Sequence, residues 1–315
     1  MKLGVKSFLF LAASLGGFSA ITEANQFGTI TALQGDVDLF KNPSRTLDGP
    51  APRVSMEGIY YTATKANIGD KIEKGSVLRT NLNAQAKVIS EDGDQLYIAP
   101  GSSYSIDGET ESHASIHLLY GSIRGVVTRF FGKQKNISVK THDAIMGIRG
   151  TDYYISRKGI VPRTKLVVVR GEVSMKRAIA SDEKPILVSK GNSGVLTAES
   201  LPQIHTTSQL ELSVVKKTAH VESTPTTELS QELAERVSGL EKTATEATVE
   251  DIKKTDPKIK EIKLAKTEKL EDLNNLVVEE IYSKAPKLHK DITPEEIEED
   301  LSTSGYDKYI DHSGL

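Results

Sequence analysis

Short stretches of alternating apolar and polar residues follow one another over residues 27–201, separated by turns that contain glycine or proline. A period of two is typical of β-strands that bury one face. In the first stretch Ile30, Val37 and Leu39 are expected on the core face. Gly35 marks a bend or bulge between them. The pattern therefore predicts a series of short strands.

Two stretches make this prediction more specific. Residues 86–90 and 95–98 flank Asp92-Gly93, and Asp-Gly between two alternating stretches is a strong hairpin signal. Residues 165–169 are apolar on both faces, which indicates a central strand. Strands recur about every 8–12 residues and no long helical pattern interrupts them. The sequence thus predicts an all-β fold, a sandwich or a solenoid-like roll of short strands.

Residues 1–24 resemble a signal peptide. Lys2 and Lys6 form a positively charged region before an apolar run. This run is too short to span the roughly 30 Å core of a bilayer. Cleavage is expected after Ala24, with Ala20 as the alternative. No later stretch is long and apolar enough to span a membrane, so we expect a soluble mature protein in the periplasm or outside the cell.

The mature chain is expected to have three parts. The β domain covers residues 25–201, a Ser/Thr/Pro linker covers 202–227, and residues 228–315 form an acidic tail of helical or disordered character. Amphipathic helices are indicated by apolar residues at helical spacing, namely Leu229, Leu233, Val237 and Leu240, and then Ile259, Ile262, Leu270, Leu273, Val277 and Ile281. Thr293 and Pro294 mark the start of a further helix.

Charge is distributed unevenly along the chain. Residues 205–315 hold 15 Lys and Arg against 24 Asp and Glu, a net charge of -9, whereas the preceding residues hold 25 against 19, a net charge of +6. Isolated helices with narrow apolar stripes are marginal in water. Two interpretations of the tail stay open: a partly disordered segment, or a docking or coiled-coil segment that folds against the basic β domain.

The order of several motifs resembles the FecR domain. The matching pieces lie at residues 68–80, 86–100, 118–124, 137–152 and 167–173, and the most specific of them is Gly147-Ile-Arg-Gly-Thr-Asp152. The resemblance implies an all-β extracytoplasmic module that senses, scaffolds or binds and has no catalytic role. The regulators that give the family its name add a cytoplasmic anti-sigma segment. Few residues precede the apolar run here, so direct sigma-factor regulation is not expected.

The central motif supplies the candidate site residues. Gly147 and Gly150 allow sharp bends, and Ile148 between them is expected in the core. Arg149 carries five donors in a fixed geometry and is interpreted as a clamp on loop carbonyls or a carboxylate, with a ligand contact as the alternative. The last two site residues, Thr151 and Asp152, are expected to satisfy turn amides.

No cofactor, metal site or catalytic group is predicted. Cysteine is absent, which excludes disulfides and thiolate chemistry. His113 and His117 share a strand face but lack a third zinc ligand, and His142-Asp143 is not part of a nucleophile elbow. The Tyr60-Tyr61 and Tyr153-Tyr154 pairs are expected to be half-buried, because one residue of each pair faces out of a strand.

A basic stretch surrounds two phenylalanines and comprises Arg124, Arg129, Lys133, Lys135 and Lys140. We interpret it as a solvated loop, with binding of an anionic envelope polymer as the alternative. A pI of about 6.2 gives no indication of nucleic acid. The function expected is therefore that of a non-enzymatic, FecR-like protein that binds, scaffolds or senses through an envelope protein partner. The alternative is association with a cell-envelope glycan such as peptidoglycan.

Overall fold

The computed structural model describes residues 26–48, 53–56, 58–110, 113–128, 136–158, 163–179, 182–197, 199–221, 229–257, 259, 264, 267 and 269–286. The predicted signal peptide, the basic residues Arg129, Lys133 and Lys135, and the helix start at Thr293 lie outside these residues.

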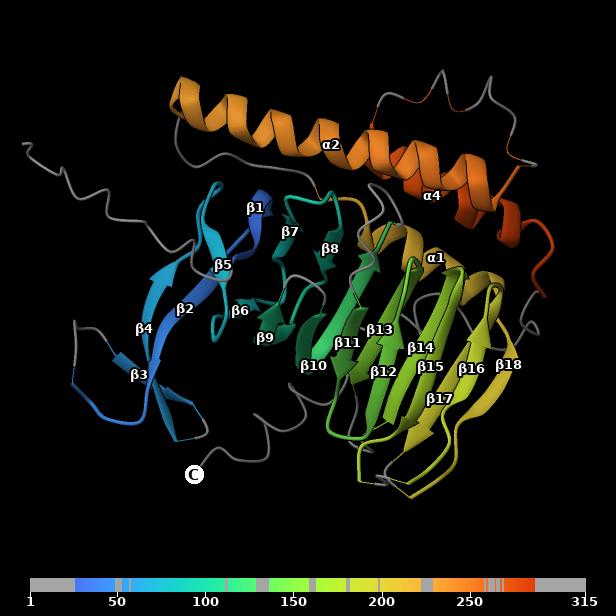
Figure 1. Cartoon of the computed structure of the whole chain (residues 1–315), viewed down its shortest axis with the longest axis horizontal. Helices are drawn as coiled ribbons and strands as arrows, with labels where there is room; N and C mark the ends of the chain where they lie inside the picture. Colours follow the sequence, from blue (N-terminus) through green and yellow to red (C-terminus); the bar gives the residue numbers. More distant parts are fainter. Residues whose placement is uncertain are drawn as a thin grey trace, which may run out of the picture.

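The described residues contain eighteen strands, which form two layers (Figure 1). In spatial order, sheet A contains β5 (Lys71–Glu73), β1 (Gln26–Gln34), β7 (Gln85–Ile89), β8 (Gln95–Ile98), β10 (His113–Val126), β13 (Asp152–Lys158), β14 (Arg163–Arg170), β17 (Asn192–Thr197) and β18 (Gln203–Thr206). Sheet B contains β3 (Arg53–Met56), β4 (Ile59–Lys65), β2 (Val37–Ser44), β6 (Val77–Thr80), β9 (Ser103–Thr110), β10, β11 (Asn136–Lys140), β12 (Ala144–Ile148), β15 (Glu172–Arg177) and β16 (Ile186–Ser189). All neighbours are antiparallel except β10 and β11.

Strand β10 belongs to both sheets. Its first half pairs with β9 and β11 in sheet B, and its second half, from Gly121 onward, pairs with β8 and β13 in sheet A. Gly121 has a φ of +90°, and a Cβ atom there would lie 2.3 Å from the Ser102 hydroxyl. That hydroxyl accepts from Ser122 N at 2.8 Å. Glycine is therefore required where the strand passes from one layer to the other.

Hairpins alternate between the two layers as the chain advances. The pairs β7–β8, β13–β14 and β17–β18 lie in sheet A, while β11–β12 and β15–β16 lie in sheet B. The first strand of each hairpin pairs with a strand that comes earlier in the chain. Successive hairpins therefore extend the sandwich in one direction. The predicted all-β fold, described as a sandwich or a solenoid-like roll, is confirmed.

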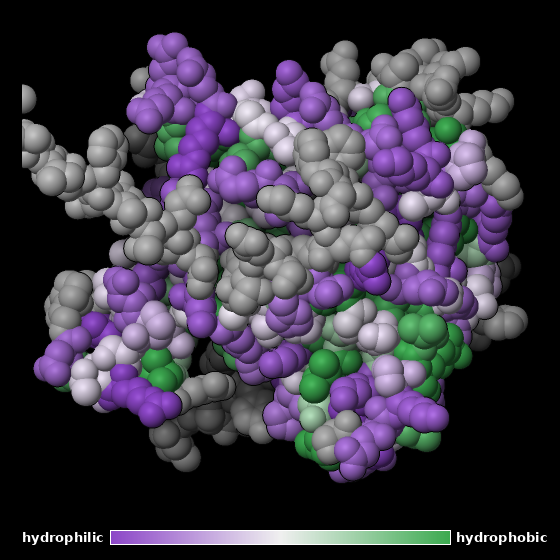
Figure 2. Space-filling view, in the orientation of Figure 1, coloured by the Kyte–Doolittle hydropathy of each residue, from purple (hydrophilic) through white to green (hydrophobic). Residues whose placement is uncertain are grey.

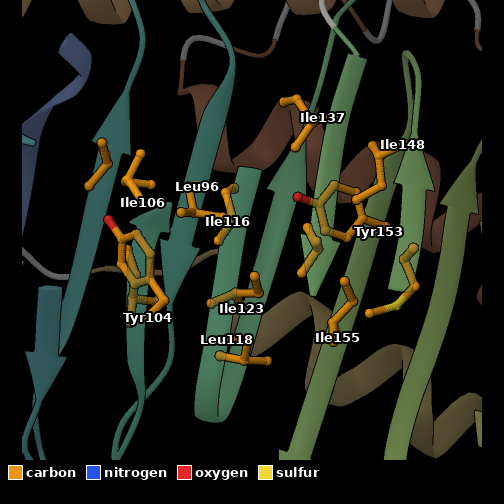
Figure 3. Close-up of a cluster of buried hydrophobic side chains, with 14 of the residues drawn as sticks. Leu96, Tyr104, Ile106, Ile116, Leu118, Ile123, Ile137, Ile148, Tyr153 and Ile155 are labelled. Carbon is orange, nitrogen blue, oxygen red and sulfur yellow. The ribbon is translucent and has the colours of Figure 1, made fainter. Parts of the chain in front are cut away.

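The main core lies between the two sheets. Figure 3 shows Leu96, Ile123 and Tyr153 from sheet A beside Ile106, Ile116 and Ile148 from sheet B. The residues expected in the core at the start of the chain, Ile30, Val37 and Leu39, also belong to this cluster. Every described member of the cluster lies in residues 27–196, so the sandwich has a core that needs no helix.

Three helices, α1 (Gln209–Thr218), α2 (Gln231–Thr255) and α4 (Leu270–Tyr282), form a helical layer over the outer face of sheet A. Figure 1 shows α2 as the longest helix, lying beside the strands with α4 next to it. Residues 202–227, predicted as a linker, instead contain β18 and α1, because the capping box of Ser208 and Glu211 starts a helix there. Two interpretations of the tail were left open, a partly disordered segment and a segment docked on the β domain. The described helices are docked on sheet A.

Candidate interaction surfaces

The apolar contacts between the sandwich and the helical layer form clusters that are separate from the main core. Tyr154, Val167 and Val169 on the outer face of sheet A pack against residues of all three helices, such as Leu212, Ile252 and Leu273. Ile89 packs against Leu240, Ala244 and Leu270 in a second cluster. Leu166 and Val168 point the other way into the main core, so β14 is buried on both faces as predicted. Polar groups occupy much of the remaining interface.

Arg124 of β10 is fully buried at the centre of this interface. Its Nε and Nη2 atoms donate to the two carboxylate oxygens of Asp152 at 3.0 and 2.8 Å. The same guanidinium donates to the carbonyl of Val215 on α1 and to the carbonyl of Asn274 and the side chain of Asn275 on α4, at 3.0–3.2 Å. One side chain of the sandwich thereby holds two helices in place.

A neutral hydrogen-bond network extends this centre. Asn274 Nδ2 donates to Gln95 Oε1 at 2.6 Å and to the Tyr97 hydroxyl at 3.0 Å, and Gln95 Nε2 donates to Thr248 of α2 at 2.9 Å. Tyr97 Oη also donates to Gln95 at 2.8 Å. Burial raises the pKa of Tyr97 well above its ordinary value, so the hydroxyl remains a donor. Strand β8 is thus connected to both α2 and α4.

Ion pairs across the interface have nearly uniform polarity. Sheet A and the turn after β16 supply cations, and the helical layer supplies carboxylates: Lys87 lies 2.7 and 2.6 Å from Glu241 and Glu271, Lys165 lies 2.6 Å from Glu211, Arg170 lies 2.8 Å from Asp251, and Lys190 pairs with Asp256 and Glu280. Arg236 of α2, 3.9 Å from Glu91, has the reverse polarity. The basic body and the acidic tail therefore meet in complementary charges.

Several buried polar atoms in this interface are poorly satisfied. Arg170 Nε and Nη2 have no hydrogen-bond partner within the described part of the chain, although Asp251 lies within ion-pair distance. Asn274 Oδ1 likewise has none among the described residues. Buried donors and acceptors without partners each cost about 1–3 kcal/mol. Arg170 and Asp251 are therefore held together as an ion pair without an aligned hydrogen bond.

Glu211 joins the start of α1 to sheet A. Burial by itself would raise the pKa of this carboxyl, but the ion pair with Lys165 and the hydrogen bonds from Ser208 outweigh burial and lower the pKa to about 2. His205 Nε2 lies 3.1 Å from the same carboxylate. The charged form of Glu211 thus stabilises the docked position of α1.

The predicted site residues do not form one site. Gly147 and Arg149 are exposed, whereas Gly150, with a φ of +60°, and the next two residues are buried. Ile148 lies in the core as expected. The Thr151 hydroxyl has no hydrogen-bond partner among the described residues, and the Asp152 carboxylate binds Arg124. The prediction that these two side chains satisfy turn amides is therefore wrong: β13 begins at Asp152 and directs its side chain toward the helical layer.

The other candidate groups are separated from each other. His113 and His117 lie on the outer face of sheet B, and the described residues contain no group of three or more His, Cys, Asp or Glu that could hold a metal ion. His142 Nδ1 lies 2.9 Å from Asp143, whose carboxylate is also 3.4 Å from Arg157 and accepts from Thr164. Asp143 is thus engaged in contacts that fix neighbouring strands.

Two sequence interpretations change in the structure. Arg124, assigned to a basic stretch, is buried beneath the helices and cannot contribute to an exposed basic patch. Tyr153 and Tyr154, expected to be half-buried, are both buried, because Tyr153 faces the main core and the helical layer covers Tyr154. No helix in the described residues is both long and apolar enough to cross a membrane.

The C-terminal edges of both sheets carry exposed apolar side chains. Leu187 of β16 is 59% exposed and Ile204 of β18 is 43% exposed, and Leu201 precedes β18. Figure 2 shows apolar residues at the end of the molecule where Figure 1 places β16, β17 and β18. Strand edges without charged or proline residues are prone to pair with other chains.

Helix α1 and the role of Arg124 were missed by the sequence interpretation. A signal for α1 was present, because Ser208 and Glu211 have capping-box spacing and Leu212 and Val215 share a helix face. For Arg124 no local signal exists, since its partners are about 28, 91 and 150 residues away in the chain. Its role depends on the tertiary fold.

Comparison with known proteins places the family motif within this architecture. Residues 76–174, from just before β6 to within β15, match the family model described as FecR protein. Two crystal structures of a candidate anti-sigma factor from Parabacteroides distasonis ATCC 8503 have a TM-score of 0.35 with this chain. They share 14% sequence identity with it, and each match covers 41% of this chain and 59% of that chain. No curated protein matches the chain.

Proposed function

We propose that this chain, which carries a FecR domain at residues 76–174, is a non-catalytic protein of the cell envelope that senses or scaffolds through protein–protein contacts. The family match supports a sensing or signalling role. The apolar N-terminal run supports export to the periplasm or the cell exterior.

The main support for this proposal is that residues of the FecR segment bind the helices of the helical layer. Four cations lie within residues 76–174 and together contact α1, α2 and α4, namely Lys87, Arg124, Lys165 and Arg170. Directed charge pairs and side-chain hydrogen bonds to another polypeptide layer are the contacts by which proteins select partners. The same FecR surface therefore has the chemistry of a protein-recognition face.

Glycan binding is the competing function. A substitution at one surface residue can distinguish glycan binding from protein binding. Lys140 is an exposed residue of the basic stretch on sheet B, whereas Arg124 of that stretch is buried. If the protein acts on peptidoglycan, Lys140→Glu should weaken its sedimentation with purified sacculi. If it acts through a protein partner, the same substitution should leave the partner contact unchanged.

The experiment uses the full exported chain as bait in cell-envelope extract, with cross-linking and mass spectrometry. A partner is accepted when it captures the chain reciprocally and forms a complex with it from purified components. We expect such a complex, unaffected by Lys140→Glu. Sedimentation with sacculi that depends on Lys140, with no purified protein complex, would contradict the proposal. A substrate turned over by the wild-type chain but not by His142→Ala or Asp143→Asn variants that remain folded would contradict it as well.

A further inference from the structure

The outer face of sheet A carries cationic side chains that are buried because the helical layer covers them. The main core between the sheets contains no described residue of the helical layer, so the sandwich folds around its own interior. On an ordinary exposed sheet face, long cationic side chains would point into water. Here Lys87, Arg124 and Arg170 are each at least 95% buried beneath helices that are connected to the sandwich through polar contacts.

The contacts on this face combine apolar clusters with directed ion pairs and hydrogen bonds. Apart from Tyr154, Val167 and Val169, the face contributes few side chains to the largest apolar cluster with the helices. An interface between parts of one chain that is rich in polar groups resembles a transient protein–protein interface more than a core. Buried ion pairs of this kind contribute little net stability and give specificity for a matching partner.

The occupant of the face leaves part of it unsatisfied. Arg170 is 2% exposed and its Nη2 lies 2.8 Å from Asp251 Oδ2 without hydrogen-bond alignment, while its Nε has no hydrogen-bond partner among the described residues. Asn274 Oδ1 on α4 is a second buried atom without a hydrogen-bond partner among the described residues. A carboxylate presented from a slightly different helix position could bind the guanidinium at two points, which is the geometry that arginine favours.

Together these observations identify a class of partner. We propose that the outer face of sheet A is a docking face for an acidic amphipathic helix of a partner protein, and that α2 and α4 occupy this face until the partner displaces them. The partner helix carries carboxylates that meet Lys87 and Arg170 and an apolar stripe that meets Ile89 and Val169. This inference rests on the proposed function, because it names the partner class for the same FecR surface.

The test weakens the resident helices without altering the face. Asp251→Lys on α2 removes the partner of Arg170, and Glu271→Gln on α4 is a milder change that removes one partner of Lys87. The probe is a fluorescent synthetic peptide of residues 229–257, which has the acidic amphipathic character of α2. Its binding to the full chain is measured by fluorescence anisotropy, and hydrogen exchange reports whether the strands stay folded and the helices lose protection.

We expect the peptide to bind both variants at least tenfold more tightly than the wild-type chain. Adding Arg170→Gln to the Glu271→Gln variant should reverse that gain. Glu246→Lys serves as the matched control, since Glu246 is exposed on α2 and, within the described part of the chain, pairs with Lys242 of its own helix at 4.0 Å. This control should bind the peptide as the wild-type chain does.

Two outcomes would overturn the inference. One is equal peptide affinity for wild type and for a variant whose helices have lost protection while its strands remain folded. The other is tighter binding that Arg170→Gln does not reduce. Capture of a protein partner that the peptide does not compete with would leave the proposed function standing and remove this inference, whereas absence of any purified partner complex would remove the proposed function.

Discussion

Arg124 and Asp152 form a two-point ion pair that lies on the sandwich but is completed by the helices. Their strands, β10 and β13, are neighbours in sheet A, and their side chains are 0% and 1% exposed. The remaining donor capacity of Arg124 is directed to α1 and α4. Without the helical layer this pair would face solvent, so the pair connects the stability of the β-sandwich to the position of the tail.

Replacing Arg124 should therefore be costly. In Arg124→Met the Asp152 carboxylate stays buried without its cation, and the Val215 and Asn274 carbonyls lose a donor. Removing one partner of a buried pair typically costs about 3–5 kcal/mol, and we expect a loss of this size in the free energy of unfolding measured with urea.

Arg79→Met is the matched control for that measurement. Arg79 also binds an aspartate, Asp38, at 3.0 Å, but its side chain is 38% exposed. Exposed pairs contribute about 0–1 kcal/mol, so the control should lose no more than about 1 kcal/mol. Equal losses in the two variants would mean that the burial of Arg124 has no energetic consequence. The double variant Arg124→Met with Asp152→Leu should regain part of the loss, because it removes the unpaired charge.

A second prediction concerns the packing of Tyr153 against Gly125. A Cβ atom on Gly125 would lie 2.3 Å from Cζ of Tyr153, which faces the main core. Gly125→Ala must therefore displace a buried ring, at a cost of about 1–3 kcal/mol. Gly108→Ala on β9 is the control, since nothing lies within 4 Å of its added Cβ. Thermal unfolding should separate the two, and a Gly125→Ala protein as stable as the control would show that the ring moves freely.

A third prediction concerns the open edges of the sandwich. Leu187→Lys and Ile204→Lys place charges on β16 and β18, where the side chains are exposed. Charged residues on edge strands prevent pairing with other chains. We expect the double variant to keep its unfolding temperature and to show less self-association by light scattering at high concentration. Leu82→Lys, at a 56% exposed position away from these edges, should leave self-association unchanged. If that control has the same effect as the edge variant, added charge alone is responsible.

Local patterns were sufficient to predict the strands and one hairpin, but not the pairing of strands that are distant in the chain. The Asp92-Gly93 hairpin and the apolar β14 follow from period-two patterning and turn chemistry, which act over a few residues. The crossing of β10 between layers at Gly121 depends on Ser102 and so on long-range pairing. The sequence therefore indicated a sandwich or roll without distinguishing how the hairpins alternate.

The candidate site was less accessible from the sequence than the fold. Asp152 was identified from the family motif, but its partner Arg124 was assigned to an exposed basic stretch. A charged residue within a strand is normally placed on the solvent side. The charge asymmetry between body and tail left docking as one of two interpretations of the tail, and it did not specify which carboxylate meets which cation. Such pairs join residues that are 46 to 184 positions apart, for example Lys165 with Glu211 and Lys87 with Glu271.

The fourth prediction is a pH dependence of α1 docking. The pKa of Glu211 is lowered from its usual 4.5 to about 2, so its charged form is favoured in the folded protein. A carboxyl with a depressed folded-state pKa contributes stability that is fully present above pH 4.5 and is lost as the pH falls through 2. At about 1.4 kcal/mol per pKa unit, the contribution is on the order of 3 kcal/mol.

Glu211→Gln should therefore lower the free energy of unfolding at pH 7 and flatten its decline between pH 4.5 and 2. Other carboxyls with lowered pKa values, Asp38 and Glu280, titrate in the same direction, so the measured quantity is the difference between wild type and variant at each pH. Hydrogen exchange of residues 209–218 should locate the loss in α1. The exposed control Glu246→Gln should run parallel to wild type across the range. If the difference between wild type and Glu211→Gln stays constant from pH 7 to 2, the Lys165 contact does not hold the charge on Glu211, and α1 is held by its apolar face alone.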